Sequence, residues 1–247
     1  MAKWFKISAG VIGVYFICLL ALMPASFVLQ WVTLPSQLQL SVVSGTIWHS
    51  KIKTANYDNF LVNDIEIELS PLSLLTLDPN IKLTFGGALV SGPEGVANIN
   101  GIFSALRITD ANISLRADNI SAHLNLPLPV KAHDFVDINV SEFVAGKAIC
   151  QSLSGNIAWN KAAVTVLDQK VALGKLSTAL SCQQGDVVIT LDEKNDLGLS
   201  FSASVGQGFA VSGNGYLTPN STMPKAFEQV LPFLGKPDRQ GRYLLRF

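Results

Sequence analysis

The protein has 247 residues, a length that suits one large β domain or two small ones. Charged residues make up 15% of the chain, well below the roughly 25% of a typical soluble domain. The formal net charge is +0, and the sequence has neither a basic surplus nor a basic stripe, which argues against a nucleic-acid-binding protein.

The first predicted element is a single transmembrane helix. The run from Ile7 to Leu29 carries no charged residue, and Lys3 and Lys6 precede it. A helix over this run would be about 35 Å long, enough for a hydrocarbon core of roughly 30 Å. The two lysines place the N-terminus in the cytoplasm by the positive-inside rule. Residues 1–30 are therefore expected to be a cytoplasmic tip and an anchor, with the rest of the chain beyond the membrane.

A cleaved signal peptide is the alternative for the same segment. The candidate cleavage sequence ends at Ala25 but has the bulky Met23 two positions earlier, and the apolar run continues to Leu29. These features favour an uncleaved anchor. In either case the rest of the chain is exported.

The exported part is predicted to be mostly β. Apolar and polar residues alternate with period 2 in several runs, as in an antiparallel sheet that buries one face. The apolar positions are Ile65, Ile67 and Leu69; Ile81, Leu83 and Phe85; Ile113, Leu115 and Ala117; Ile120, Ala122, Leu124 and Leu126; Val187, Ile189 and Leu191; and Leu197, Leu199, Phe201, Ala203 and Val205. Helix is expected only at a short turn over residues 70–75 and over residues 222–234.

A weak internal repeat predicts two related β units. Ser44–Trp48 resembles Ser154–Trp159, and each segment opens a stretch of strands. The units are expected to cover residues 31–126 and 127–247, joined at the sequence Leu-Pro-Leu-Pro. Chance similarity between two Gly-containing turns is the alternative.

Cys150 and Cys182 are expected to form a structural disulfide. Both lie in the exported part, in an oxidising compartment, whereas Cys18 lies within the apolar segment. Two free thiols are the alternative. The cysteine spacing does not match a metal site, and His49, His123 and His133 do not cluster with the cysteines.

No residue pattern predicts an enzyme active site or a cofactor site. The sequence has no Gly-x-Ser-x-Gly, phosphate-binding loop or metal-binding His/Glu helix. Asp64, Glu66 and Glu68 share one strand face and are interpreted as a solvated surface. Trp48 and Trp159 are candidates for partner contacts, with burial in the sheet core as the alternative.

Four segments occur in a recognisable order: Val43–Trp48 soon after the apolar N-terminal run, Ile67–Leu75 with its Pro turn and Leu-Leu pair, Gly155–Trp159, and Phe233–Tyr243. Together with the paired cysteines, they resemble the type II secretion system protein N family over nearly the full chain. The first segment is similar to that family's early Gly-x-Val-Trp motif, and the third to its second-half repeat.

This resemblance implies a non-catalytic accessory component of the machinery that moves folded proteins from the bacterial periplasm across the outer membrane. It implies a single-pass inner-membrane protein with most of its chain in the periplasm and other secretion subunits as partners. An exposed sheet edge is the expected contact surface.

The Pro turn and Leu-Leu unit also resemble envelope proteins with long, curled antiparallel sheets, some of which handle lipid. This gives an alternative function, a lipid-binding or lipid-transfer protein with an apolar β groove. A chaperone-like periplasmic binding protein is a third option.

Overall fold

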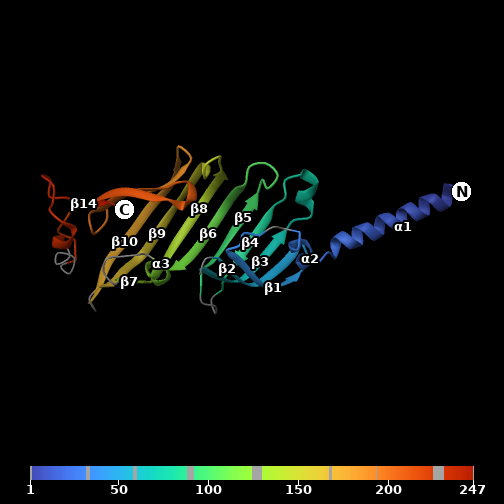
Figure 1. The fold of residues 1–247 in the computed structure, drawn as a ribbon, viewed down its shortest axis with the longest axis horizontal. Coiled ribbons are helices and arrows are strands. Elements are labelled where there is room, and N and C mark those ends of the chain that lie inside the picture. The colour runs from blue at the N-terminus through green and yellow to red at the C-terminus, as the bar shows by residue number, and fades with distance from the viewer. Residues whose placement is uncertain are drawn as a thin grey trace. The chain divides into compact units, whose positions relative to one another are not determined.

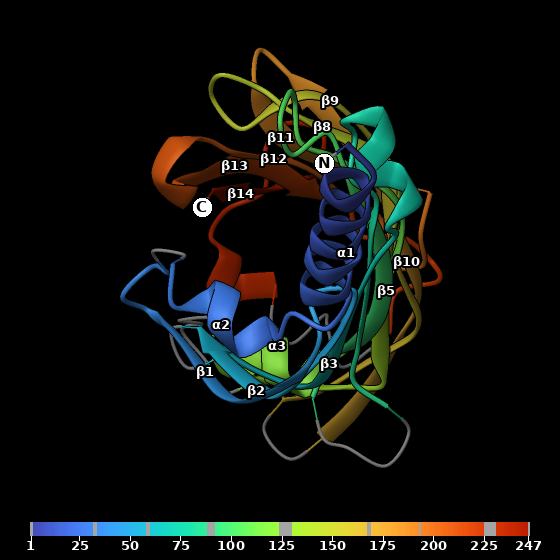
Figure 2. The same cartoon turned by 90° about the vertical axis from the view of Figure 1, so that its right-hand side faces the viewer.

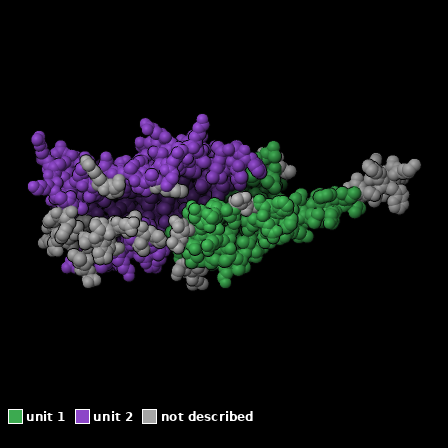
Figure 3. Space-filling view, viewed as in Figure 1, with its two compact units in different colours: residues 1–92 green, residues 93–247 purple. Residues whose placement is uncertain are grey.

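The computed structural model describes residues 2–31, 34–57, 60–87, 92–123, 130–166, 169–192, 194–224 and 231–246. The chain divides into two compact units, Met1–Gly92 and Pro93–Phe247, which are coloured separately in Figure 3. The unit boundary predicted at residues 126 and 127 lies in segment 124–129, outside the described residues.

The N-terminal unit combines helices with an antiparallel sheet in the order β1-β2-β3-β4 (Figure 1). Its elements are α1 (Ala2–Ala21), α2 (Ala25–Leu29), β1 (Leu38–Gly45), β2 (His49–Tyr57), β3 (Phe60–Leu69), the 3-10 helix η1 (Leu72–Thr76) and β4 (Ile81–Phe85). Within the described ranges, β1 pairs with β2 alone and is therefore an edge strand.

The helix predicted over residues 7–29 is broken in the structure. Helix α1 ends at Ala21, and Pro24 precedes α2 in an extended conformation with a ψ of 138°. Proline lacks an N–H and cannot continue a helical hydrogen-bond ladder, which explains the break. Among the residues that the structure describes, no helix meets the length and hydropathy needed to cross a membrane.

The C-terminal unit is an antiparallel sheet in the order β5-β6-β8-β9-β10-β11-β12-β13-β14, with β7 pairing with β9. Figure 2 shows that this sheet curves rather than lying flat. Its elements are β5 (Glu94–Asn100), β6 (Arg107–Arg116), α3 (Ala117–His123), β7 (Val130–His133), β8 (Phe135–Ala145), β9 (Cys150–Val166), β10 (Gln169–Gln183), β11 (Asp186–Leu191), β12 (Leu199–Val205), the 3-10 helix η2 (Gln207–Phe209), β13 (Val211–Leu217), the 3-10 helix η3 (Leu231–Leu234) and β14 (Tyr243–Arg246).

The mostly β, antiparallel fold predicted from alternation is confirmed. The alternating runs fall in β3, β4, β6, β11 and β12, except that Ala117 begins α3 and Leu197 precedes β12, and the short turn predicted over residues 70–75 becomes η1. One run was misassigned, because Ile120 and Ala122 lie in helix α3 rather than in a strand. Of the helix expected over 222–234, residues 225–230 lie outside the described ranges and residues 231–234 form η3.

The core of the C-terminal unit forms where α3, η3 and β14 pack near the strands. Its most buried members include Ala117 and Ala162, each 2% exposed. Partly buried Trp159, Leu234 and Tyr243 pack against this cluster. The N-terminal unit has its own smaller cluster of strand side chains around Ile52, Ala55 and Ile65.

In the sheet of each unit, some strand residues have backbone angles that interrupt the regular alternation of side chains between the two faces. In the N-terminal unit, Val42 and Asp64 have φ values of 40° and 48°, and both lie opposite Lys53 on β2. On β2 between them, Ile52 and Ala55 are three positions apart and belong to the same apolar cluster. In the C-terminal unit, Asp110 has a φ of 50°. Such irregularities bend strands and help a sheet to curve.

Replacing Asp110 tests this irregular backbone conformation. Asp110 is exposed, and a regular strand would favour Val at this position because of its β-propensity. In the left-handed region a β-branched side chain clashes with its own backbone. We therefore expect Asp110→Val to lower the free energy of unfolding by about 1–2 kcal/mol in urea titrations. Asp110→Gly is the matched control and should be nearly neutral, since relief of strain offsets the added unfolded-state entropy. A stabilised Val variant would contradict the observed backbone.

Candidate functional site

The segment around Trp48 fastens the N-terminal helices to the first sheet. The indole Nε1 of Trp48 donates a hydrogen bond to the carbonyl oxygen of Leu20 at 3.0 Å. The backbone N–H of Ile47 donates to the carbonyl oxygen of Met23, also at 3.0 Å. Pro24 and Thr46 form an isolated antiparallel bridge. Carbonyls at the end of a helix need partners from outside the helix, and the turn between β1 and β2 supplies them.

The same tryptophan connects this junction to η1. The carbonyl oxygen of Trp48 accepts a hydrogen bond from the N–H of Leu69 at 2.9 Å. The next residue, Ser70, donates its N–H to the carbonyl oxygen of Asn80, which closes the loop that carries η1. Trp48 is half-buried and lies outside both core clusters. It therefore joins three segments: the end of α1, the β1–β2 turn and the end of β3.

Trp159 has a different environment, although it belongs to the matching sequence segment. It lies on β9 opposite Leu176 and packs against the core of the C-terminal unit. Its Nε1 donates to the carbonyl oxygen of His133 at 2.9 Å, where β7 gives way to β8. The two tryptophans thus lie in separate units, and Trp159 is placed to stabilise the fold.

The predicted disulfide is present between Cys150 and Cys182, with Cα atoms 6.1 Å apart. The N–H groups of Ile149 and Cys150 both donate to the carbonyl oxygen of Gly185. The disulfide and these hydrogen bonds fasten the β8–β9 turn to the β10–β11 turn.

The acidic run on β3 makes polar contacts at the surface. Glu66 pairs with Lys51 on β2, and Glu68 lies 3.6 Å from the Nδ1 of His49. The hydrogen bond from Lys51 lowers the pKa of Glu66 and raises that of Lys51. Exposed pairs of this kind contribute little to stability. The interpretation of this strand face as solvated agrees with these contacts.

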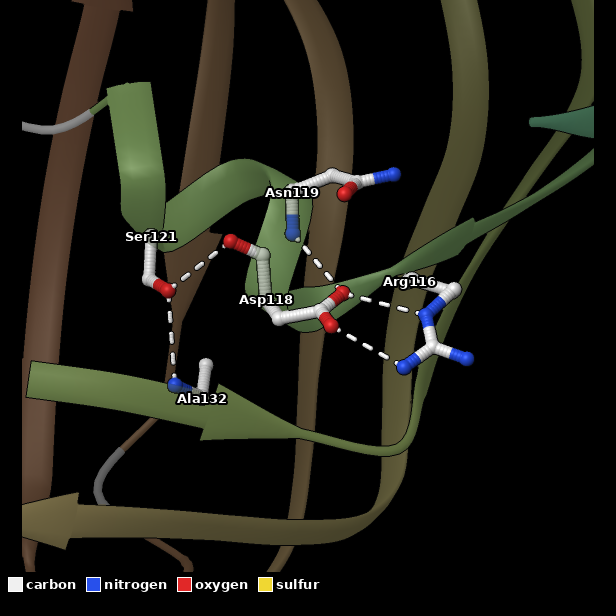
Figure 4. A network of polar contacts seen from close by, with 5 residues as sticks. All are labelled: Arg116, Asp118, Asn119, Ser121 and Ala132. Atoms are coloured by element: carbon white, nitrogen blue, oxygen red, sulfur yellow. Dashed lines mark hydrogen bonds and ion pairs between the residues drawn. The ribbon is translucent and has the colours of Figure 1, made fainter. Parts of the chain in front are cut away.

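A polar network connects α3 with the end of β6 and with β7 (Figure 4). The guanidinium of Arg116 donates to both carboxylate oxygens of Asp118, at 3.2 and 2.9 Å. The hydroxyl of Ser121 donates to the carbonyl of Asp118 and accepts from the N–H of Ala132 on β7. This network positions Ala117, at the start of α3, in the core.

This network predicts a pH effect on stability. The hydrogen bond from Arg116 lowers the pKa of Asp118. The pair therefore stabilises the fold fully above the unfolded carboxyl pKa of about 3.9, and that contribution is lost as the pH falls through the lower folded value. We expect Asp118→Asn to cost about 0.5 kcal/mol near neutral pH, because the pair is partly exposed. Urea titrations at successively lower pH should show this cost shrinking. A cost that is independent of pH would contradict the assignment.

Within the described ranges, no three His, Cys, Asp or Glu residues lie close enough together to hold a metal ion. The side chain of His123 lies outside the described side chains, and the imidazole of His133 is hydrogen-bonded to the hydroxyl of Thr165 at 2.7 Å. The junction at Trp48 is made of backbone carbonyl and N–H groups and the Trp48 indole.

Comparison with known proteins identifies a family for the chain. The family described as type II secretion system (T2SS), protein N matches residues 36–246, a range that includes the Trp48 segment, both disulfide cysteines and Trp159. The protein belongs to this family. It is thus a type II secretion system component, as the sequence resemblance implied.

Curated relatives are similar in sequence over most of the chain. Type II secretion system protein N of Aeromonas hydrophila is 30% identical over 93% of this chain and 91% of its own length. The proteins of the same name from Vibrio cholerae and Pectobacterium carotovorum are 25% and 24% identical, over 90% and 98% of this chain and 88% and 98% of their own lengths. No solved structure gives a significant match.

Sequence reasoning singled out Trp48 but missed its partners. The carbonyl groups of Leu20 and Met23 carry no side-chain signal, so their role emerges only from the backbone geometry. It also missed the exposure of the η1 leucines. The clustering of Leu72, Leu74 and Leu77 in a turn too short to bury them was the available signal.

Proposed function

We propose that the protein is a non-catalytic accessory subunit of type II secretion, held at the inner membrane by its N-terminal segment. Its two β units lie in the periplasm and act through contacts with other secretion subunits. The junction of Thr46–Trp48 with Leu20 and Met23 is the observation that carries this proposal. It couples an apolar N-terminal helix directly to a sheet with an open edge.

The open edge offers a route for partner binding. Strand β1 pairs only with β2 in the described ranges, and an edge strand can accept a partner strand through main-chain hydrogen bonds. Val42 on this strand is 69% exposed and has a positive φ. A β-branched residue in that conformation is strained, and such strain is often retained for function.

Site-specific photo-crosslinking in cells tests this role of β1. A photoreactive amino acid at Val42 should give adducts with another type II secretion subunit. Ser154 is the matched control, because it is also exposed but lies on β9 with neighbouring strands on both sides. Equal adducts at both positions, or none at Val42 in a secreting cell, would argue against edge recognition.

A lipid-binding role is the second candidate. The apolar cluster of the N-terminal unit consists of strand side chains alone, and most of its members are only partly buried. A one-sided apolar sheet of this kind suits acyl chains. Photoactivatable phospholipid in cells distinguishes the two functions, since the lipid candidate predicts labelling of this apolar face and the secretion candidate predicts adducts at β1.

A further inference from the structure

The 3-10 helix η1 exposes leucine side chains. Leu72 and Leu77 are 75% and 80% exposed, and Leu74 between them is also exposed. Leu77 ends the helix with a φ of 57°, a conformation that is uncommon for a bulky apolar residue. Exposed apolar area together with backbone strain in one short segment indicates an interaction surface.

The position of η1 is set by the junction at Trp48. Trp48 contacts Leu20 of α1 through its indole and Leu69 of β3 through its carbonyl group, and η1 begins shortly after Leu69. Within the N-terminal unit, Figures 1 and 2 show η1, in teal, at the end of the sheet from which α1 leaves. Helix α2 lies at the same end in Figure 1, and Figure 2 shows it on the other side of α1 from η1.

Apolar residues gather at this end of the unit. On and just after α2, Phe27, Val28 and Trp31 are all exposed, and Trp31 is 78% exposed. The sequence has no Asp, Glu, Lys or Arg from residue 7 to residue 50. Tryptophan is favoured at the headgroup level of a bilayer, where its ring is both apolar and able to donate a hydrogen bond.

We infer that η1 is a second membrane contact, whose leucines insert into the interfacial layer of the same leaflet from which α1 emerges. Its place at the end of the unit from which α1 leaves, together with the uncharged stretch over residues 7–50, makes a phospholipid bilayer the occupant. Two separate contacts would fix the orientation of the N-terminal unit on the membrane, since a single helix leaves a domain free to swing. This inference rests on the proposed inner-membrane anchor.

Depth-dependent quenching in vesicles tests the inference. The full chain with Cys18→Ser, and with the Cys150–Cys182 disulfide intact, is labelled with an environment-sensitive fluorophore at Leu77→Cys. It is then reconstituted into vesicles of phosphatidylethanolamine and phosphatidylglycerol, with or without lipids brominated on the acyl chain. Leu61→Cys is the matched control, because Leu61 is 49% exposed but lies about 26 Å along β3 from Leu69.

The label at Leu77 should be quenched by the brominated lipids and protected from aqueous iodide, and the label at Leu61 should show the reverse. Adding Leu72→Ser and Leu74→Ser should reduce the lipid quenching at Leu77 several-fold while the chain still floats with the vesicles. If the chain floats but Leu77 is quenched only by iodide, η1 is not a membrane contact and the anchor stands. If the chain does not float at all, the anchor fails and this inference fails with it.

Discussion

Removing the Cys150–Cys182 disulfide is expected to lower the free energy of unfolding of the C-terminal unit by about 3.5 kcal/mol. The two cysteines are separated by 32 positions, and cross-linking a loop of that length removes conformational entropy from the unfolded chain. The same bond joins the β8–β9 turn to the β10–β11 turn, which are also connected by hydrogen bonds to the carbonyl of Gly185. Its loss should therefore loosen the contact between these two turns first. Urea titration of the full chain with Cys150→Ala and Cys182→Ala measures the effect.

Cys18→Ser provides the matched control, because Cys18 is an exposed thiol in α1 and forms no disulfide. It should leave the unfolding midpoint of the C-terminal unit unchanged. A double alanine variant as stable as the parent protein would mean that the disulfide is not a structural support.

Trp159→Ala should have an effect of similar size, about 3 kcal/mol. The substitution removes a large side chain that packs against the core and leaves the carbonyl of His133 without its indole donor. Trp159→Phe keeps an aromatic ring in the core and should cost less, about 1 kcal/mol, because it loses the hydrogen bond but only part of the packing. Chemical unfolding followed by circular dichroism measures both variants.

Trp48→Ala tests whether Trp48 supports the junction with α1 rather than the core of the fold. Trp48 lies outside the core clusters, so Trp48→Ala should leave the stability of the C-terminal unit unchanged. It should instead loosen the end of α1, seen as faster amide hydrogen exchange at Met23 and Ile47.

A stable Trp159→Ala variant that fails to secrete would show that Trp159 acts as a partner contact.

Much of the fold was predictable because burial on one face of a sheet produces a period-2 pattern. Ile65, Ile67 and Leu69 illustrate this pattern on β3. The pairing of Cys150 with Cys182 was predictable from their shared compartment. These features depend on local patterning or on simple elimination, which a sequence carries directly.

Other features depend on tertiary contacts that a sequence does not carry. The run Ile120 to Leu126 alternates like a strand, yet Ser121 bonds to β7 and Arg116 holds Asp118, so a helix forms through residue 123. Short apolar runs are ambiguous between helix and strand without such contacts. The candidate site shows the same limit, since Trp48 was identifiable but its acceptor, the carbonyl of Leu20, was not.

Deletion of the gene in the source bacterium tests the central claim most directly. Extracellular hydrolase activity and outer-membrane permeability to a hydrophobic dye would be assayed together, with the full chain and a chain lacking residues 2–31 as complements. We predict that hydrolases accumulate in the periplasm at normal permeability, and that only the full chain restores secretion. Normal secretion with free entry of the dye would contradict the secretion role and favour lipid handling.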